Sequence, residues 1–345
     1  MGTVEHLATC IEQDLCALFP AMYKNPRKKL ATMIAALIET RSCNTMERSA
    51  RLPIETERAE SRYAWIERFL STDTIDDMDV MEAMTRRLLP TLSARGQTLM
   101  ISVDQTSLDA GRAIAMMSAR IGERALPVFW CVKNAKGNRP IKNDLPLLER
   151  LQTGVPDGVK VMVLADRFFG SSERVSAGQR HGFAYRIRLK GNLTLTHQGG
   201  ELSVDERARL NLHGLIDVDL CNSGVITNIG YVHDKGHAEP WFIAMDTVPS
   251  RATTLDYGLR WSIEPMFADF KSRGFRFQDT HLQRPERISR LLLVLTLALT
   301  WATANGQAVQ KKTTLTGSLK QIARSALSFC KQGLRYLIYC AQSFK

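Results

Sequence analysis

Two apolar runs that each end at an aspartate place the strongest constraint on the fold of this chain. The run Leu99–Val103 leads into Asp104, and the run Val159–Ala165 leads into Asp166. Near-continuous apolar runs of this length, rich in β-branched residues, are typical of strands in the middle of a parallel or mixed sheet, where both faces are covered. Ligands of such sheets bind beyond the carboxyl ends of the strands. The sequence therefore predicts an α/β fold in which two aspartates leave adjacent strand ends and converge.

Each aspartate also has a simpler interpretation as a turn residue or as the cap of a following helix. The segment SSERVSAGQRHG, which follows Asp166, indicates such a helix. A third acidic residue favours the functional interpretation.

Glu264 lies in the spacing Y-x2-R-x3-E-x6-K, formed with Tyr257, Arg260 and Lys271. At about 100° per helical residue, these four positions fall within roughly 60° of one helix face. A carboxylate flanked by two bases suits a metal site whose substrate is a polyanion, because the acid binds the cation and the bases bind phosphates. A solvated helix face with an Arg260–Glu264 pair is the alternative.

Pro265 bears directly on this helix. Proline inside a helix removes a hydrogen bond and disfavours the α conformation in the preceding residue. We expect a kinked helix across 257–271. The alternative is a helix that begins near Pro265, which would leave Tyr257 and Arg260 on a separate segment.

Asp104, Asp166 and Glu264, with the Tyr, Arg and Lys positions around the glutamate, resemble the catalytic triad and signature of the DDE transposases of insertion sequence family four. The resemblance spans about residues 99–271, roughly half of the chain. It implies a ribonuclease H-like mixed sheet with the aspartates on neighbouring strands and the glutamate on a later helix. It also implies a mostly β insertion before the glutamate and an N-terminal helical domain that recognises the terminal inverted repeats of the element.

The segment between Asp166 and Glu264 agrees with an insertion. A strand ending near Lys190 is followed by the short segments LTLTH, LIDVDLCNS, VITNIGYVHD and PWFIAMD, which are separated by Gly, Asn and Asp. Such segments predict short strands joined by turns. They either form a small β insertion or extend the core sheet.

The predicted organisation has five parts. They are a helical DNA-binding domain (1–95), the first part of the catalytic core (96–190), a β-rich insertion (191–245), the second part of the core with Glu264 (246–305) and a basic helical C-terminal region (306–345). A chain of 345 residues that is 44% hydrophobic can bury a core of this size.

The N-terminal part predicts amphipathic helices in KKLATMIAALIET and RYAWIERFLS, from the apolar spacing that includes Leu30, Ile34 and Tyr63. The polar, basic stretch TRSCNTMERSARLP between them is predicted to be a turn between DNA-contacting helices. A plain helical bundle is the alternative.

The net charge of +11 indicates an anionic partner. Nine bases and no acid occur from residue 287 onward: Arg287, Arg290, Lys311, Lys312, Lys320, Arg324, Lys331, Arg335 and Lys345. This region is predicted to contact nucleic acid, with an ordinary basic terminal helix as the alternative. The apolar run 291–304 has only 14 residues, fewer than the ~20 that span a bilayer, and predicts a buried helix.

The seven cysteines are scattered without CxxC spacing and predict reduced thiols. The pair His233 and His237 has Gly236 between its members, which indicates a turn rather than a metal site. No apolar signal region opens the sequence, so we expect a cytoplasmic, nucleoid-associated bacterial protein without a membrane partner.

The resemblance implies that Asp104, Asp166 and Glu264 hold two divalent ions, Mg2+ with Mn2+ as a substitute. It assigns DNA contacts to Tyr257, Arg260, Lys271 and Trp261, with double-stranded DNA as substrate and a homodimer in the synaptic complex. Trp241 is a second candidate for stacking on an unpaired base, and packing in the core is the alternative for both tryptophans. Arg167, which follows Asp166, is predicted to be a structural or phosphate-neutralising base.

Three other functions compete with transposition. A ribonuclease H-like endonuclease or resolvase would share the acids without joining strands. A catalytically silent DNA-binding derivative would keep only the basic surfaces. A glycosidase with paired carboxylates fits poorly, because a neutral sugar has no need of bases beside the acid.

Overall fold

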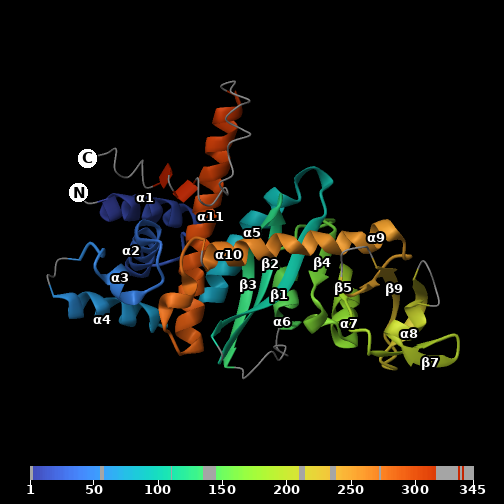
Figure 1. Ribbon diagram of the computed structural model, residues 1–345. Helices are drawn as coiled ribbons and strands as arrows, with labels where there is room; N and C mark the ends of the chain where they lie inside the picture. The colour runs from blue at the N-terminus through green and yellow to red at the C-terminus, as the bar shows by residue number, and fades with distance from the viewer. Residues whose placement is uncertain are drawn as a thin grey trace. The chain divides into compact units, whose positions relative to one another are not determined.

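The computed structural model describes residues 3–54, 58–109, 111–134, 145–209, 214–233, 238–271, 273–315, 333–334 and 336–337. The chain forms two compact units (Figure 1). We call Met1–Ala83 with Met266–Lys345 the helical unit, and Met84–Pro265 the sheet unit. The predicted domain boundaries stay predictions.

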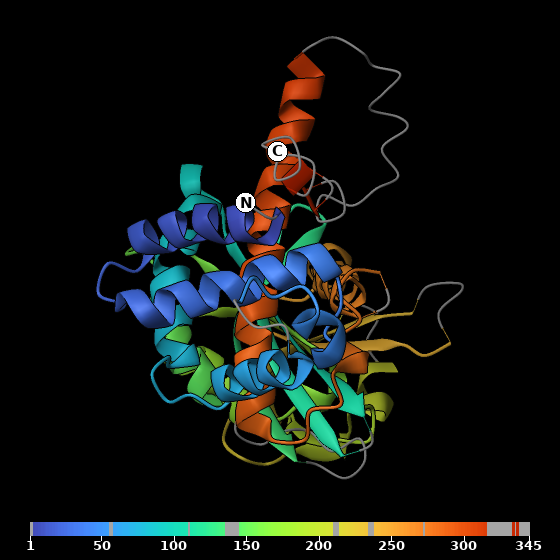
Figure 2. The same ribbon diagram turned by 90° about the vertical axis from the view of Figure 1, so that its left-hand side faces the viewer.

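The helical unit consists of helices from both ends of the sequence. Its elements are α1 (Thr3–Leu18), α2 (Lys24–Thr40), α3 (Thr45–Ser49), α4 (Ala59–Leu70), η4 (Phe277–Thr280) and α11 (Pro285–Leu315), with parts of α5 (Asp77–Leu92) and α10 (Ile263–Phe270). Helix α2 contacts α1 and α11, and α11 also contacts α4. Figure 2 shows α1 lying along α2.

Both predicted N-terminal helices are present as α2 and α4. In α2, every residue from Leu30 to Ile38 is buried, because this helix packs against two neighbours. In α4, Ile66 and Phe69 are buried, but Tyr63 is 38% exposed and lies outside the buried face. The stretch predicted as a turn contains the short helix α3, which begins after Asn44 because that side chain accepts hydrogen bonds from the Met46 and Glu47 N–H groups.

Helix α11 confirms the buried helix predicted at 291–304. Its residues Leu291–Leu299 are all buried. Within the described part of the chain, Pro285–Gly306 is the one helix that is long and apolar enough to cross a membrane, and 72% of its apolar window is buried inside the protein. This burial favours a core helix.

Two of the nine C-terminal bases serve the helical unit itself. Arg287 forms an ion pair with Glu67. Arg290 pairs with Asp77 and donates from Nη1 to the Thr72 carbonyl at 3.0 Å. Lys320, Arg324, Lys331, Arg335 and Lys345 lie outside the described residues, as do the side chains of Lys311 and Lys312. The DNA-contacting role of this region stays a prediction.

The sheet unit contains one ten-stranded sheet in the order β3-β2-β1-β4-β5-β10-β9-β8-β6-β7. The strands are β1 (Leu99–Asp109), β2 (Arg112–Ile121), β3 (Arg124–Asn134), β4 (Val161–Ala165), β5 (Ala184–Arg188), β6 (Thr194–His197), β7 (Gly200–Ser203), β8 (Leu215–Leu220), β9 (Ile226–Val232) and β10 (Trp241–Met245). Strands β1, β4 and β5 run parallel, and the other pairs are antiparallel.

Short helices connect or flank these strands. They are η1 (Ala94–Gly96), α6 (Leu145–Gln152), η2 (Arg167–Phe169), α7 (Ser172–Arg180), α8 (Val204–Arg209), α9 (Arg251–Leu255) and η3 (Asp256–Ser262). Helix α7 is the helix predicted after Asp166. The mixed α/β fold is confirmed in this coarse form, with a single sheet and helices in the same unit.

The four strands predicted between Lys190 and Asp246 are present as β6, β8, β9 and β10. They do not form a separate sheet. Strand β10 pairs with β5 through Ile243–Arg188, Ala244–Ile187 and Met245–Arg186, so these strands continue the core sheet. Of the two alternatives left open by the sequence, extension of the core sheet is the one observed.

Candidate active site

Asp104 and Asp166 occupy equivalent positions on neighbouring parallel strands. The last aligned pair of β1 and β4 is Val103 with Ala165, and the two aspartates are the next residues. Neighbouring strands lie about 4.8 Å apart, so the register brings the backbones of the two aspartates close together. The predicted convergence of these two positions agrees with this register.

The expectation that the first strand ends at Asp104 was wrong. Strand β1 continues to Asp109, because residues after Asp104 keep pairing with β2, as in Gln105 with Ala115 and Thr106 with Ile114. Only the parallel neighbour β4 ends at this level. Asp104 therefore lies where β1 loses its pairing with β4 and keeps its pairing with β2, and its side chain is mostly buried.

The helix expected across 257–271 is present as two contiguous helices of different type. Tyr257 and Arg260 lie on the 3-10 helix η3, and α10 begins at Ile263. Pro265 is thus in the first turn of α10, where its missing N–H leaves no hydrogen bond unmade. Tyr257 and Arg260 are therefore continuous with α10 rather than on a separate segment, but the common-face argument fails for them because it assumed α-helical spacing. In a 3-10 helix, residues three apart lie above one another, and Arg260 lies 5.7 Å from the centre of the Tyr257 ring.

Arg260 joins two of the three acids. Its Nη1 donates to Oδ2 of Asp104 at 2.7 Å, and its Nη2 donates to Oε1 of Glu264 at 3.1 Å. The side chain of Arg260 is 9% exposed and that of Asp104 is 15% exposed, whereas Glu264 is 58% exposed. Helix η3 contacts β1, β4 and β5, so it places this guanidinium beside the strand that carries Asp104.

Tyr257 connects η3 to the remaining acid. Its hydroxyl donates to Oδ1 of Asp166 at 3.4 Å. The ring is buried with Trp241, Ile243 and Met245 of β10. Burial raises the pKa of Tyr257 to about 12, so the phenol stays protonated and remains a donor. The three acids are thus held around one 3-10 helix by a phenol and a guanidinium.

The electrostatics of this site favour a cation. Burial raises the pKa of Asp104, and the nearby charges of Asp166 and Glu264 raise it further, while Arg260 and the Gln105 N–H oppose the shift. Burial alone would lower the pKa of Arg260, but the acidic groups Tyr257, Asp104, Asp166 and Glu264 outweigh it and raise that pKa. Carboxylates that repel one another in a partly buried site are stabilised by any positive charge between them.

Hard carboxylate oxygens are the ligands that Mg2+ and Mn2+ prefer, so the chemistry of the three acids fits a divalent ion. In the arrangement described, the Arg260 guanidinium supplies the positive charge between Asp104 and Glu264. No group of three or more acidic, His or Cys side chains close enough to hold a metal ion occurs among the described residues. The metal-binding roles of Asp104, Asp166 and Glu264 stay predictions.

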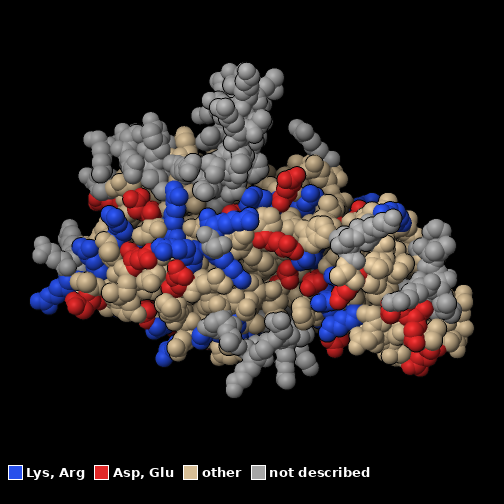
Figure 3. All heavy atoms as spheres, viewed as in Figure 1, with Lys and Arg blue, Asp and Glu red and all other residues tan. Residues whose placement is uncertain are grey.

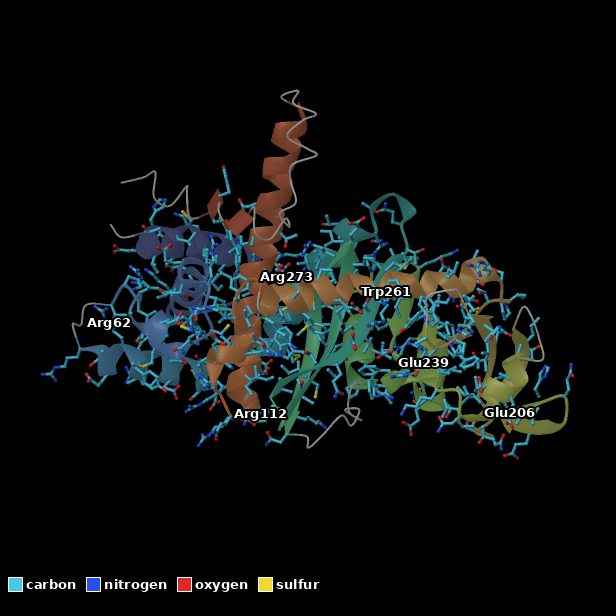
Figure 4. The ribbon with its side chains drawn as sticks, viewed as in Figure 1. Arg62, Arg112, Glu206, Glu239, Trp261 and Arg273 are labelled. Atoms are coloured by element: carbon cyan, nitrogen blue, oxygen red, sulfur yellow. The ribbon has the colours of Figure 1, made fainter. Side chains whose placement is uncertain are left out.

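The two candidate stacking tryptophans have different environments. Trp241 is 7% exposed and packs edge-on against Tyr257 at 5.1 Å and against Trp261 at 5.5 Å, so core packing accounts for it. Trp261 is 45% exposed on η3 (Figure 4). An indole held by an aromatic neighbour and open to solvent is suited to stack on a base.

Lys271 follows α10 directly and belongs to the helical unit. It is half-buried, and burial lowers its pKa. Its predicted contact with a DNA phosphate stays a prediction.

The sequence interpretation missed Arg186, which positions η3. This buried residue of β5 donates to Oδ1 of Asp246 at 2.6 Å, to the Tyr185 carbonyl at 2.7 Å and to the Thr253 carbonyl at 2.9 Å. It thereby ties β5 to the segment that leads into α9 and η3. The sequence did contain a signal for this role, since bases alternate along this segment at Arg186, Arg188 and Lys190. A base on the buried face of a strand needs hydrogen-bond partners, so the alternation could have predicted a structural arginine here.

Figure 3 shows Lys and Arg side chains interspersed with Asp and Glu on the face in view.

Solved structures give only weak likenesses. Ciona intestinalis Endonuclease V in complex with a 24mer DNA containing an inosine followed by a ribo-adenosine is 14% identical, with 51% of this chain and 84% of that chain covered and a TM-score of 0.29. Human ENDOV is 15% identical, with 64% and 97% covered and a TM-score of 0.27. Scores this low carry no argument about fold or activity. No curated protein matches the sequence.

A family model does match. Residues 137–301 match the model described as Transposase DDE domain, a segment that includes Asp166 and Glu264 and begins after Asp104. Members of this family cleave DNA and generally use divalent metal ions. The match supports a DDE transposase-type, DNA-cleaving domain in this part of the chain.

Proposed function

We propose that this chain is a cut-and-paste transposase of insertion sequence family four, which cleaves DNA at the ends of an element and transfers the freed strands into target DNA. The observation that carries the proposal is the arrangement of Asp104 and Asp166 at equivalent positions of parallel strands, with Glu264 linked to Asp104 through Arg260. The strand order β3-β2-β1-β4-β5, with three antiparallel strands followed by two parallel ones, supports a ribonuclease H-like core.

Asp104, Asp166 and Glu264 would hold two Mg2+ ions, which Mn2+ could replace. When bound, such a pair activates the attacking oxygen and neutralises charge on the phosphoryl group and the leaving oxygen. A water molecule attacks the phosphodiester at the element end and releases a 3′-hydroxyl. That hydroxyl then attacks a phosphodiester of the target, so that one P–O bond forms as another breaks. Neither step needs a covalent intermediate on the protein.

The remaining site residues bind and orient the substrate in this proposal. Tyr257 holds Asp166 through its hydroxyl, as it does in the structure described. Arg260 and Lys271 contact phosphates, and Trp261 stacks on an unpaired base. Arg260 pairs with Asp104 and Glu264 before substrate binds. To contact a phosphate, it must give up its bond to one of these carboxylates and bind the phosphate in its place.

We propose further that the enzyme acts as a homodimer on the terminal inverted repeats and on target DNA, in the bacterial cytoplasm. The synapsis of two element ends requires two active sites. The C-terminal bases beyond residue 310 would contribute to DNA contact or assembly.

The test uses purified full-length protein, supercoiled plasmid DNA and Mg2+ or Mn2+. Wild type should nick the plasmid, and Asp104→Asn, Asp166→Asn and Glu264→Gln should each abolish nicking while still binding DNA. Asp157→Asn, at an exposed turn before β4, removes the same charge and should leave nicking unchanged. Retained nicking in any of the three variants would remove that residue from the site.

A second assay separates transposition from simple cleavage. A labelled oligonucleotide with a free 3′-hydroxyl is incubated with the plasmid, and covalent joining is measured. Nicking without joining would favour the endonuclease, and DNA binding without either reaction would favour the catalytically silent derivative.

A further inference from the structure

A polar pocket in the sheet unit is surrounded by three basic side chains. It has a volume of about 270 Å³ and is lined by Arg167, Arg188, Leu189, Lys190, Gly191, Asn192, Asp205, Glu239, Pro240 and Phe242. Arg167 directly follows Asp166, so one lining residue of this pocket is adjacent in the chain to a candidate catalytic acid. Arg188 and Lys190 come from the end of β5.

Backbone contacts hold these bases together. A Cβ on Gly170 would lie 2.4 Å from the carbonyl oxygen of Arg188, so only glycine lets the η2 loop pack directly on the end of β5. The Leu189 N–H donates to the Phe242 carbonyl at 2.7 Å and joins the same strand end to β10. The positions of Arg167 and Arg188 are therefore determined by the fold of the backbone.

Glu239, which is labelled in Figure 4, forms ion pairs with both arginines. Its Oε2 accepts from Nη1 of Arg167 at 2.7 Å and from Nη2 of Arg188 at 3.4 Å. One anionic oxygen shared by two guanidinium groups is the arrangement by which proteins bind phosphate oxygens. The carboxylate of Glu239 thus occupies the position that a phosphate oxygen would take.

The charge of the pocket changes with the position of Glu239. Arg167, Arg188 and Lys190 face two acids, Glu239 and Asp205, so one positive charge is in excess while Glu239 is in place. Lys190 also lies 5.8 Å from the centre of the Phe168 ring, which keeps it at the η2 side. Glu239 is 61% exposed and can leave the pocket, because exposed ion pairs contribute little to stability.

We propose that this pocket is a binding subsite for a backbone phosphate of DNA, and that Glu239 acts as an internal anion that DNA displaces. The proposal rests on the proposed function, because it assigns the strand beside Asp166 to this pocket. It adds a phosphate contact through Arg167 and Arg188, and it adds Glu239 as a competitor of that phosphate.

The experiment measures binding of a fluorescein-labelled DNA duplex by anisotropy, in EDTA and over a range of NaCl concentrations. Glu239→Gln should bind up to about fivefold more tightly than wild type, since it removes a competitor of roughly the strength of an exposed ion pair. Because the phosphate contact is made in both proteins, the gain comes from removal of the competing ion pair and should diminish as salt screens that pair. Glu201→Gln, at an exposed position of β7, removes the same charge and is the matched control.

A double variant identifies the pocket as the origin of the effect. Arg167→Gln together with Arg188→Gln should weaken binding, and Glu239→Gln should then give no more gain in that background than Glu201→Gln gives. Equal effects of Glu239→Gln and Glu201→Gln, a gain that persists without both arginines, or no duplex binding by the wild type would each overturn the proposal. Because EDTA removes metal-dependent cleavage, failure here is distinct from failure of the nicking assay.

Discussion

Replacement of Arg260 by Met should destabilise the sheet unit through one of its two ion pairs. The pair with Asp104 is mostly buried, with side chains 9% and 15% exposed and a distance of 2.7 Å. Removal of one partner of a buried pair costs about 3–5 kcal/mol, because it leaves the other charge buried and unpaired. The Nε of Arg260 is buried without a hydrogen-bond partner, and this unsatisfied donor destabilises the wild type. Its removal in the Met variant should offset the cost by about 1 kcal/mol. The expected cost is therefore about 2–4 kcal/mol.

The pair between Arg260 and Glu264 provides an internal comparison. Glu264 is 58% exposed, and an exposed pair four residues apart on a helix contributes about 0.3–0.5 kcal/mol. Glu264→Gln should therefore cost less than about 0.5 kcal/mol, although the two distances to Arg260 differ by little. Burial rather than distance decides the difference, since water screens the exposed pair.

The assay is urea unfolding followed by circular dichroism, with each transition fitted separately because the chain has two compact units. The double variant Asp104→Asn with Arg260→Met removes both buried charges. Its cost should be lower than the sum of the two single costs by about 2 kcal/mol or more. Equal costs for Arg260→Met and Glu264→Gln, or additive costs in the double variant, would refute this reasoning.

Three further outcomes are expected. Because burial raises the pKa of Asp104 above its ordinary value of 3.8, the stability linked to its protonation is present below that pH and is lost as pH rises through the folded pKa. As pH rises through that pKa, the Asp104→Asn variant should lose less stability than the wild type. If urea unfolding gives the two proteins the same change of stability with pH, the reasoning is wrong. Gly170→Ala should lower the stability of the protein by about 1–3 kcal/mol, because the added Cβ would meet a backbone oxygen. Gly258→Ala should cost much less, because a Cβ there meets no atom within 4 Å. Equal melting temperatures of the two variants in calorimetry would contradict this packing argument. Lys271→Ala should lower the salt slope of duplex binding by about one if this residue contacts a phosphate, and an unchanged slope would assign it to the protein surface.

Local patterns in the sequence were sufficient for the elements that burial determines. The apolar run at 291–304 became the buried part of α11, and the alternating segments after Lys190 became β6, β8, β9 and β10. The aspartate that follows Val159–Ala165 stands directly after β4. These predictions succeeded because side-chain period and apolar content are properties of a few neighbouring residues.

Predictions that depended on partners far along the chain were less accurate. Strand β1 extends past Asp104 because β2 pairs with it, and no pattern within 99–104 contains that information. The Tyr257 to Lys271 spacing suggested one helix, but the segment divides into η3 and α10. The two bases Arg287 and Arg290 counted toward a free positive charge, yet both pair with acids more than two hundred positions away in the sequence.

The sequence by itself determined which residues are available for chemistry. They are three acids in order, two directly after predicted strands and the third within a predicted helix, with a phenol and bases near the last. Only the tertiary structure decided their relations. The parallel register aligned Asp104 with Asp166, η3 inserted Arg260 between Asp104 and Glu264, and the packing at Gly170 brought Arg167 and Arg188 onto Glu239. The physical reason is that local propensity depends on a few neighbouring residues, whereas charge pairing and burial depend on which distant segments the sheet places side by side.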